Sequence, residues 1–516
     1  MKGKKTIAVL GTILVLLAAL IAGMLWCVVN YSMVDFKFYP KNAAVLDLRD
    51  REISAKHYEK LRKKMPDCEI LWNVTVQGKQ YSSDSTKLAV TGLTDADVKA
   101  ISYLENLKTV SARGCTDYAQ LLTLQEQNPE LEVVYTVQIE DQTYAQSAVK
   151  VYFSEADQKD VDKLRYLPAV TDVVAREGRE PEQLAALQDK CHEQGVSFHV
   201  MFGQDVCAED VEELTITATT DEELNLLDLL PNLKKVHFVS PEASVENLIA
   251  LRENSGLEVT WERSVYGVMV TSEDVEVDIS YHEVDNLQEL EQQMEYFPNA
   301  EKLIMSYCGI ENPTMAAFRE LHREDYKVVW TVTFNGKLPT RTDETDFFPS
   351  RDGMYYFSDV EAYNLRYCED MVSIDVGHMK VKDVGPWLSK MPNLEYLILA
   401  HTQVQYIDGI ENCKKLKFLE LDWSCIRSLD PLVGCTSLED LNIGLTWPDT
   451  SALLEMPWLK NVYMIEGSQA DAWKISQACP NTRVVTRGGA TVGSGWRQLP
   501  NYYAMRDYLG VPYMHG

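Results

Sequence analysis

The sequence predicts an α/β solenoid with parallel strands and flanking helices, preceded by one transmembrane helix. Three observations support this prediction. Leucine-type residues recur about every 22 residues in the C-terminal third, a period of 63 residues runs through the first two-thirds, and an uncharged apolar run lies near the start. A fixed period indicates a stacked unit, because one such unit cannot bury its apolar face alone.

The apolar run, residues 6–29, is long enough to cross a bilayer core of roughly 30 Å. Lys2, Lys4 and Lys5 precede it, so residues 1–5 are expected to stay in the cytoplasm. A cleaved signal peptide is the alternative, but the run is longer than a typical signal core and lacks a clear cleavage site. Residues 6–29 are therefore predicted to be a signal-anchor helix, followed by a juxtamembrane linker over residues 30–43.

Residues 44–349 are predicted to be degenerate α/β repeats of about 63 residues. Strand-like runs such as 69–76, 132–139 and 327–334 alternate with amphipathic helical patterns such as 95–104 and 221–230, and Asn335-Gly336 predicts a hairpin turn. The strand-like runs carry an aromatic column that either binds a ligand or packs between repeats, and packing is favoured because such strands bury one face. The column comprises Trp72, Tyr135, Trp261 and Trp330.

Residues 350–486 carry the clearer, 22-residue repeat. A soft apolar position precedes each leading leucine, so Cys413 and Cys435 are interpreted as buried thiols one repeat apart, with a disulfide between them left open. Residues 487–516 are predicted to be a flexible connector and a C-terminal tail. The successive apolar sets are Met371, Ile374, Val376 and Val381; Leu394, Leu397, Leu399 and Val404; Leu416, Leu419, Leu421 and Ile426; Leu438, Leu441 and Ile443; and Leu459, Val462 and Met464.

These sets resemble the leucine-rich-repeat superfamily, in particular the short 22-residue repeats of internalin-like bacterial surface proteins. One departure is consistent: Thr402, Ser424 and Thr446 stand where typical repeats carry the asparagine of the turn. A hydroxyl can make part of the same backbone hydrogen bonding. The resemblance implies a recognition surface on the concave face of the repeats.

That concave face would carry the residues between the leucines of each strand, and its rings favour contact with a protein or peptide. The alternative left open is that the C-terminal tail folds back and covers them. The candidate partner-binding residues are Tyr396, Ile398, Phe418, Glu420, Asp440, Asn442 and Tyr463.

Composition narrows the function further. The formal net charge of −29 excludes nucleic acid as a partner, because such a surface repels phosphates. Motifs for metal binding, phosphate binding or nucleophilic catalysis are missing from the sequence, so we expect no cofactor, no metal site and no enzyme activity. His378 and His401 lie one repeat apart and are interpreted as surface residues that could stack.

The sequence thus predicts a single-pass membrane protein whose bulk is extracytoplasmic and binds a protein or peptide at the cell envelope. The alternative is a non-catalytic scaffold or spacer of the cell surface that self-associates. An enzyme would require a pocket in which ionisable groups with shifted pKa values converge.

Overall fold

The structure is a computed structural model that describes residues 2–489 and 493–513. The chain forms two compact units: an N-terminal unit, Met1–Val236 with Glu242–Val259, and a C-terminal unit, His237–Pro241 with Thr260–Gly516. Residues 1, 490–492 and 514–516, which belong to the predicted cytoplasmic, connector and tail segments, lie outside the described residues.

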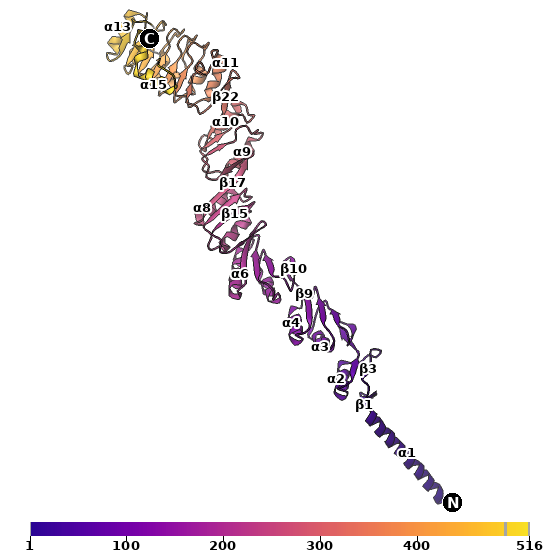
Figure 1. The fold of residues 1–516 in the computed structure, drawn as a ribbon. Coiled ribbons are helices and arrows are strands. Elements are labelled where there is room, and N and C mark those ends of the chain that lie inside the picture. Colours follow the sequence, from indigo (N-terminus) through magenta and orange to yellow (C-terminus); the bar gives the residue numbers. More distant parts are fainter. Residues whose placement is uncertain (1, 490–492, 514–516) are drawn as a thin grey trace. The chain divides into compact units, whose positions relative to one another are not determined.

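The N-terminal unit begins with one long helix, α1 (Lys2–Asn30), and the chain then passes directly into the antiparallel hairpin of β1 (Tyr31–Val34) and β2 (Lys37–Pro40) (Figure 1). The span Leu10–Asn30 has a mean hydropathy of 2.7, and its apolar window is not buried against the rest of the protein. By length and composition this helix is suited to crossing a membrane. A signal sequence near an N-terminus has the same length and composition.

Short mixed sheets with helices between their strands make up the rest of this unit. The first strands and helices are β3 (Val45–Asp47), α2 (Ala55–Lys64), β4 (Glu69–Leu71), β5 (Asn73–Val76), β6 (Lys79–Ser82), β7 (Lys87–Ala89), α3 (Asp95–Ile101), β8 (Thr109–Ala112), α4 (Tyr118–Gln127), β9 (Glu132–Ile139) and β10 (Gln142–Ala145). The next are β11 (Lys150–Phe153), α5 (Gln158–Val161), η1 (Asp162–Tyr166), β12 (Asp172–Ala175), α6 (Pro181–Gln194), β13 (Ser197–Phe202) and β14 (Asp205–Ala208).

The next sheet has the strand order β15-β16-β17-β18, and the division between the two units falls within β16 and β17. The strands and the helices between them are β15 (Glu213–Thr217), α7 (Asp221–Leu224), η2 (Asn225–Leu229), β16 (Lys235–Val239), α8 (Val245–Asn254), β17 (Glu258–Val265) and β18 (Val268–Thr271). The helical pattern predicted over 221–230 is one α-turn continued by a 3₁₀ helix. The tighter winding aligns residues three apart, such as Leu226 and Leu229, and both are buried, as is Leu227.

Hairpins end the sheets of the N-terminal unit, and this explains the 63-residue period. In the sheet β10-β9-β8-β7, the first half of β9 pairs with β8 in parallel, and its second half turns back on β10. The starts of β7, β8, β9 and β11 lie at residues 87, 109, 132 and 150, so two helical arms and one hairpin complete one period.

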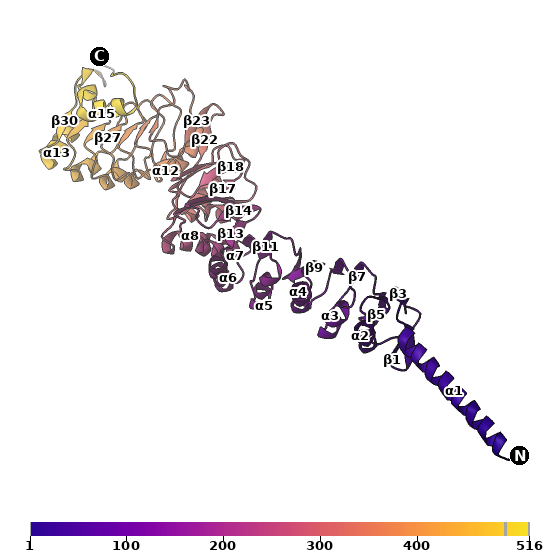
Figure 2. The same cartoon turned by 60° about the horizontal axis from the view of Figure 1, so that its bottom comes forward.

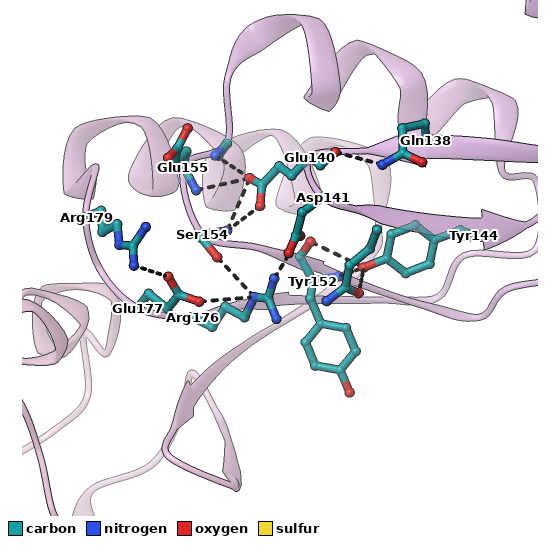
Figure 3. A network of polar contacts seen from close by, with 12 residues as sticks. Gln138, Glu140, Asp141, Tyr144, Tyr152, Ser154, Glu155, Arg176, Glu177 and Arg179 are labelled. Carbon is teal, nitrogen blue, oxygen red and sulfur yellow. Dashed lines mark hydrogen bonds and ion pairs between the residues drawn. The ribbon is translucent and has the colours of Figure 1, made fainter. Parts of the chain in front are cut away.

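A carboxylate at the tip of the β9–β10 hairpin connects one sheet to the next (Figure 3). Glu140 accepts hydrogen bonds from the consecutive backbone amides of Ser154, Glu155 and Ala156, at 2.9–3.2 Å. Arg176 donates to Ser154 Oγ at 3.0 Å and pairs with Asp141 at 3.3 Å. Successive sheets of this unit are therefore coupled at this point by side-chain hydrogen bonds, where strand pairing has ended.

The C-terminal unit continues with one further short sheet, β19-β20-β21, and the hairpin β22–β23. Asn335 and Gly336 have φ of 50° and 61°, which confirms the predicted hairpin turn. Its elements are β19 (Glu276–Asp278), α9 (Leu287–Met294), β20 (Lys302–Ile304), α10 (Asn312–Leu321), β21 (Lys327–Val329), β22 (Thr331–Phe334) and β23 (Leu338–Arg341).

Seven parallel strands then form one continuous sheet: β24 (Asp346–Phe347), β25 (Ser373–Asp375), β26 (Tyr396–Ile398), β27 (Phe418–Glu420), β28 (Asp440–Asn442), β29 (Asn461–Tyr463) and β30 (Arg483–Val485). In register, Leu397 pairs with Leu419, Leu419 with Leu441, and Leu441 with Val462. Short helices return the chain between strands: α11 (Asp359–Ala362), η3 (Tyr363–Tyr367), α12 (Gly385–Leu388), η4 (Ile410–Asn412), η5 (Asp430–Gly434), η6 (Ser451–Glu455) and α13 (Gln469–Ala478).

The repeat positions form the core of this sheet. Leu397, Leu419 and Leu441 are fully buried. Cys413 and Cys435 are buried free thiols, as predicted, and the sulfur of each donates to a backbone carbonyl oxygen of the preceding repeat. The predicted aromatic column is also packing, because Trp72, Tyr135, Trp261 and Trp330 are all buried.

The threonines that replace the turn asparagine act on the backbone through their hydroxyl groups. Thr402 Oγ1 donates to Leu399 O and Thr446 Oγ1 donates to Ile443 O, both at 2.6 Å. Both side chains are buried, so each bond satisfies a carbonyl oxygen that the turn removes from water. The hydroxyl therefore supplies part of what an asparagine would supply.

Candidate functional site

The candidate binding residues lie together on the inner face of the seven-stranded sheet, because adjacent strands are in register. One column holds Tyr396, Phe418 and Asp440 at the first position of each strand. The neighbouring column, two residues on, includes Ile398, Glu420, Asn442 and Tyr463.

The C-terminal tail covers this face. The tail contains η7 (Trp496–Gln498) and α15 (Pro500–Tyr508), and α15 lies beside the sheet in Figure 2. The Trp496 ring stacks on Phe418 with centroids 4.5 Å apart and meets Tyr463 edge-on at 5.2 Å. These rings form one cluster with Tyr396, Ile398, Ala400, Leu499, Tyr502, Met505 and Leu509.

All seven candidate residues are consequently buried, with exposed fractions from 0% for Phe418 and Tyr463 to 8% for Ile398. Of the two arrangements left open by the sequence, the structure has the covered one. The signal for it was present: Trp496, Leu499, Tyr502, Met505 and Leu509 recur at helical spacing, and Pro500 starts the helix. Contact of this face with a partner stays a prediction, and it requires the tail to leave.

Polar contacts hold the tail at several points. Asn501 Nδ2 donates to Asp440 Oδ2 at 2.9 Å and to Glu439 Oε2 at 3.1 Å. Arg351 Nη1 donates to Leu509 O at 2.9 Å. Arg506 closes the end of the tail helix by donating to Pro512 O. The tail is therefore docked through both an apolar cluster and specific hydrogen bonds.

A pocket of about 250 Å³ remains between the tail and the sheet. Its acidic groups come from the sheet side, Asp375, Glu420 and Asp422, and its basic groups come from the tail, Arg497 and Arg506. Burial raises the pKa of Glu420 to about 7, and the pKa values of Asp375 and Asp422 to about 6. Arg497 opposes each of these shifts by favouring the ionised carboxylate.

Carboxyl groups with these pKa values can exchange protons near neutral pH. The pocket therefore has part of what an enzyme would require, namely ionisable groups with shifted pKa values that lie close together. His378 and His401 also line it, and burial lowers the pKa of both imidazoles. Among the described residues, no three His, Cys, Asp or Glu side chains lie close enough to hold a metal ion. We propose no reaction for this pocket.

Exposed rings stack along the turn side of the same repeats, a feature that sequence reasoning recognised only in part. His378 and His401 stack with centroids 4.3 Å apart, and His401 and Trp423 with centroids 5.1 Å apart. All three residues have φ between 53° and 64°, a backbone conformation that is costly for bulky side chains. Trp423 is 60% exposed. We call His378, His401 and Trp423 the rim stack.

The protein is similar to several solved structures. No family model matches the sequence, and no curated protein matches it. The chain is similar to internalin C2 of Listeria monocytogenes at 19% identity, over 26% of this chain and 71% of that one, with a TM-score of 0.20. For internalin InlF of the same organism the identity is 14%, the coverage 59% and 86%, and the TM-score 0.21.

A leucine-rich-repeat protein of Leptospira interrogans, LIC12759, is similar at 10% identity, over 77% of this chain and 93% of that one, with a TM-score of 0.21. These three structures are internalin or leucine-rich-repeat proteins by their own descriptions. The class of the fold, an α/β repeat solenoid, follows from this chain's own strand register and repeat spacing.

Proposed function

We propose that the protein is anchored in a membrane by α1 and presents its repeats outside the cytoplasm as a module that binds a protein or peptide. The length and hydropathy of α1 support the anchor. The three lysines within residues 1–5 directly precede the apolar run, and we place this end of the helix in the cytoplasm. A repeat protein of this architecture offers a large inner face for recognition.

One observation carries the binding proposal: the inner face already holds a helical segment. The tail places a tryptophan between Phe418 and Tyr463 and lays one apolar side of α15 along the strands. A partner segment of the same chemistry, an amphipathic helix led by an aromatic residue, would use the same groove. The tail then acts as an internal competitor.

The rim stack offers a second contact that is accessible while the tail is docked. Exposed aromatic rings such as that of Trp423 are enriched at protein interfaces. The structural alternative is a self-associating scaffold of the cell surface. In that case the tail of one copy would occupy the face of another.

Capture from envelope extract by the full chain tests the proposal. Trp496→Ala should capture a partner more strongly than the wild type, because the inner face is freed, and adding Tyr396→Ser should reduce that capture. Trp473→Ala, at an exposed position on α13, is the matched control and should behave as the wild type. Capture of only the protein's own copies would favour the scaffold, and equal capture by wild type and Trp496→Ala would remove the inner face as the site.

Topology is tested separately on intact cells. External protease should cut the repeats, and α1 should resist extraction from membranes at alkaline pH. Release at alkaline pH would contradict the anchor, and protection of the repeats from protease would contradict the orientation.

A further inference from the structure

The first hairpin after α1 exposes apolar side chains without a protein partner to cover them in the described part of the chain. Phe36 is 93% exposed, Phe38 58% and Met33 48%. Met33 and Phe38 are cross-strand partners, so they lie on one face of the hairpin, while Val34 and Tyr39 are buried on the other. Two large rings so exposed are a cost in water.

The backbone at the hairpin tip strengthens this point. Asp35 and Phe36 have φ of 47° and 63°, a left-handed pair that closes a two-residue turn. Asparagine or glycine satisfies such a turn with less strain than phenylalanine. Phe36 therefore stands at a strained position and makes almost no use of its ring within the described protein.

The position of the hairpin, directly after the proposed membrane anchor, favours lipid as the cover for these apolar side chains. Because β1 begins at Tyr31, immediately after α1 ends at Asn30, the hairpin lies at whichever membrane surface the end of α1 reaches. Trp26 and Tyr31 have ring centroids 5.7 Å apart at this junction. Tryptophan and tyrosine at the end of an apolar helix are typical of the membrane–water interface.

A groove of about 990 Å³ runs between α1 and the hairpin. Its walls are mainly apolar, with Leu20, Met24 and Val28 from one side of the helix and Met33 and Phe38 from the hairpin. Lys41 and Lys64 also belong to the lining. Among the described residues, each lysine ammonium donates one hydrogen bond, to Val28 O and Met33 O respectively, and an ammonium has three donors.

Local charge agrees with an anionic occupant. Residues 31–64 contain nine Lys and Arg against five Asp and Glu, a net charge of +4, in a chain whose formal net charge is −29. Lys and Arg side chains close to a membrane surface attract anionic lipid headgroups. A strongly acidic protein therefore has its basic segment where it adjoins the proposed anchor.

We propose that the β1–β2 hairpin inserts Met33, Phe36 and Phe38 into the membrane interface, and that the groove beside α1 holds an anionic phospholipid whose phosphate contacts Lys41 and Lys64. This inference rests on the membrane anchor proposed above. Its consequence is a fixed attachment of the repeats at the bilayer surface, since two elements instead of one contact the lipid.

Photo-crosslinking of the full chain tests the inference in vesicles of phosphatidylcholine with or without phosphatidylglycerol. A benzophenone amino acid replaces Phe36 or, as the matched control, Asn335, which is exposed at the tip of another hairpin. We expect lipid adducts by mass spectrometry at position 36 and not at 335. Adduct yields that are equal at the two positions would overturn the inference.

The headgroup preference is measured with the same label. Phosphatidylglycerol should be enriched among the adducts at least about threefold over its share of the vesicle, and Lys41→Gln with Lys64→Gln should abolish the enrichment. Lys79→Gln with Lys87→Gln, exposed lysines further along the unit, should leave it intact. Enrichment that survives the first pair, or is missing in the wild type, would overturn the lipid site.

Alkaline extraction of the same vesicles separates the two proposals. Protein that stays in the membrane without lipid adducts at position 36 contradicts the hairpin inference alone. Protein that is released contradicts the anchor itself, and with it the inference that rests on it.

Discussion

The sheets of the N-terminal unit and the seven-stranded sheet of the C-terminal unit join successive repeats in different ways. In the first, a hairpin ends each sheet after a few strands, and contacts such as those of Glu140 join one sheet to the next. In the second, strand pairing runs unbroken from β24 to β30 over a continuous leucine core. Where backbone pairing is continuous, stability should be shared across repeats, and where hairpins interrupt it, stability should be local.

The two regions also differ in what covers the inner side of the strands. The continuous sheet carries aromatic and acidic residues on that side and requires the tail to cover them. The tail is therefore part of the folded core, and it also covers the proposed binding face. The predictions below test this contrast, beginning with the largest expected effect.

Trp496→Ala should weaken tail docking by about 3–5 kcal/mol, because the buried ring between Phe418 and Tyr463 is lost. The expected result is rapid proteolysis within residues 493–513, with the seven-stranded sheet still resistant. Trp473→Ala should leave the tail protected. A tail that stays protected in Trp496→Ala would show that the aromatic cluster does not hold it.

Leu441→Ala and Leu121→Ala compare the two modes of coupling directly, since both side chains are fully buried. Each should cost about 2–5 kcal/mol. Hydrogen exchange should quicken across β26 to β30 in Leu441→Ala, but only within the sheet of β7 to β10 in Leu121→Ala. Equal spreading in both variants would contradict the distinction between continuous and interrupted sheets.

Glu140→Gln removes the charge that three consecutive amides bind. Hydrogen bonds to a charged group contribute about 1.5–3 kcal/mol, so we expect a loss of about 2 kcal/mol in the denaturant unfolding of the N-terminal unit. Glu126→Gln, on the exposed side of α4, is the control and should change little. An unchanged midpoint for Glu140→Gln would mean that the hairpin contact does not couple the sheets.

Tail docking should weaken as pH rises. The pKa values of Asp375, Glu420 and Asp422 are raised in the docked state, so their contribution is complete below their ordinary values near 4 and is lost as pH rises through about 6 to 7. His378 and His401 oppose this trend, because their lowered pKa values favour docking above about pH 6.5.

The difference in tryptophan emission between the wild type and Trp496→Phe reports tail release during a titration between about pH 5 and about pH 8. Glu420→Gln should flatten this profile, whereas Glu466→Gln, at an exposed position, should not. A profile that weakens towards acid would show that the histidines dominate.

Thr402→Val should have the smallest effect, about 1 kcal/mol, because it removes one buried hydrogen bond to Leu399 O. Ser424→Ala is the matched comparison in the next repeat, since the Ser424 hydroxyl has no hydrogen-bond partner among the described residues. Thermal unfolding should separate the two. Equal losses would show that the hydroxyl bond of Thr402 contributes nothing particular to the turn.

Much of this fold could be predicted because leucine spacing reports burial directly. The strands at Leu397, Leu419 and Leu441, the buried cysteines and the Asn335-Gly336 turn all follow from local pattern. The closing of each sheet by a hairpin could not be predicted, because the sequence of β9 does not show which half pairs with which neighbour.

The site was predictable only in part for the same reason. The inner columns follow from strand register, but their cover comes from residues 496–509, which are far along the chain and whose helical spacing does not name the surface they pack on. The rim stack was predictable in part, because His378 and His401 lie 23 residues, one repeat, apart in the sequence. Trp423 lies 22 residues after His401, so the repeat step places it at the same turn position, but only the stacking of its ring on His401 shows that it belongs to the cluster.

The most direct test of the central claim, that the inner face is a groove for a helical segment held by the tail, is binding of a synthetic peptide of residues 493–513. Fluorescence anisotropy should show that the peptide binds full-length Trp496→Ala and not the wild type, whose own tail occupies the groove. Adding Tyr396→Ser to Trp496→Ala should weaken that binding. Failure of the peptide to bind Trp496→Ala, or equal binding to the wild type, would contradict the account.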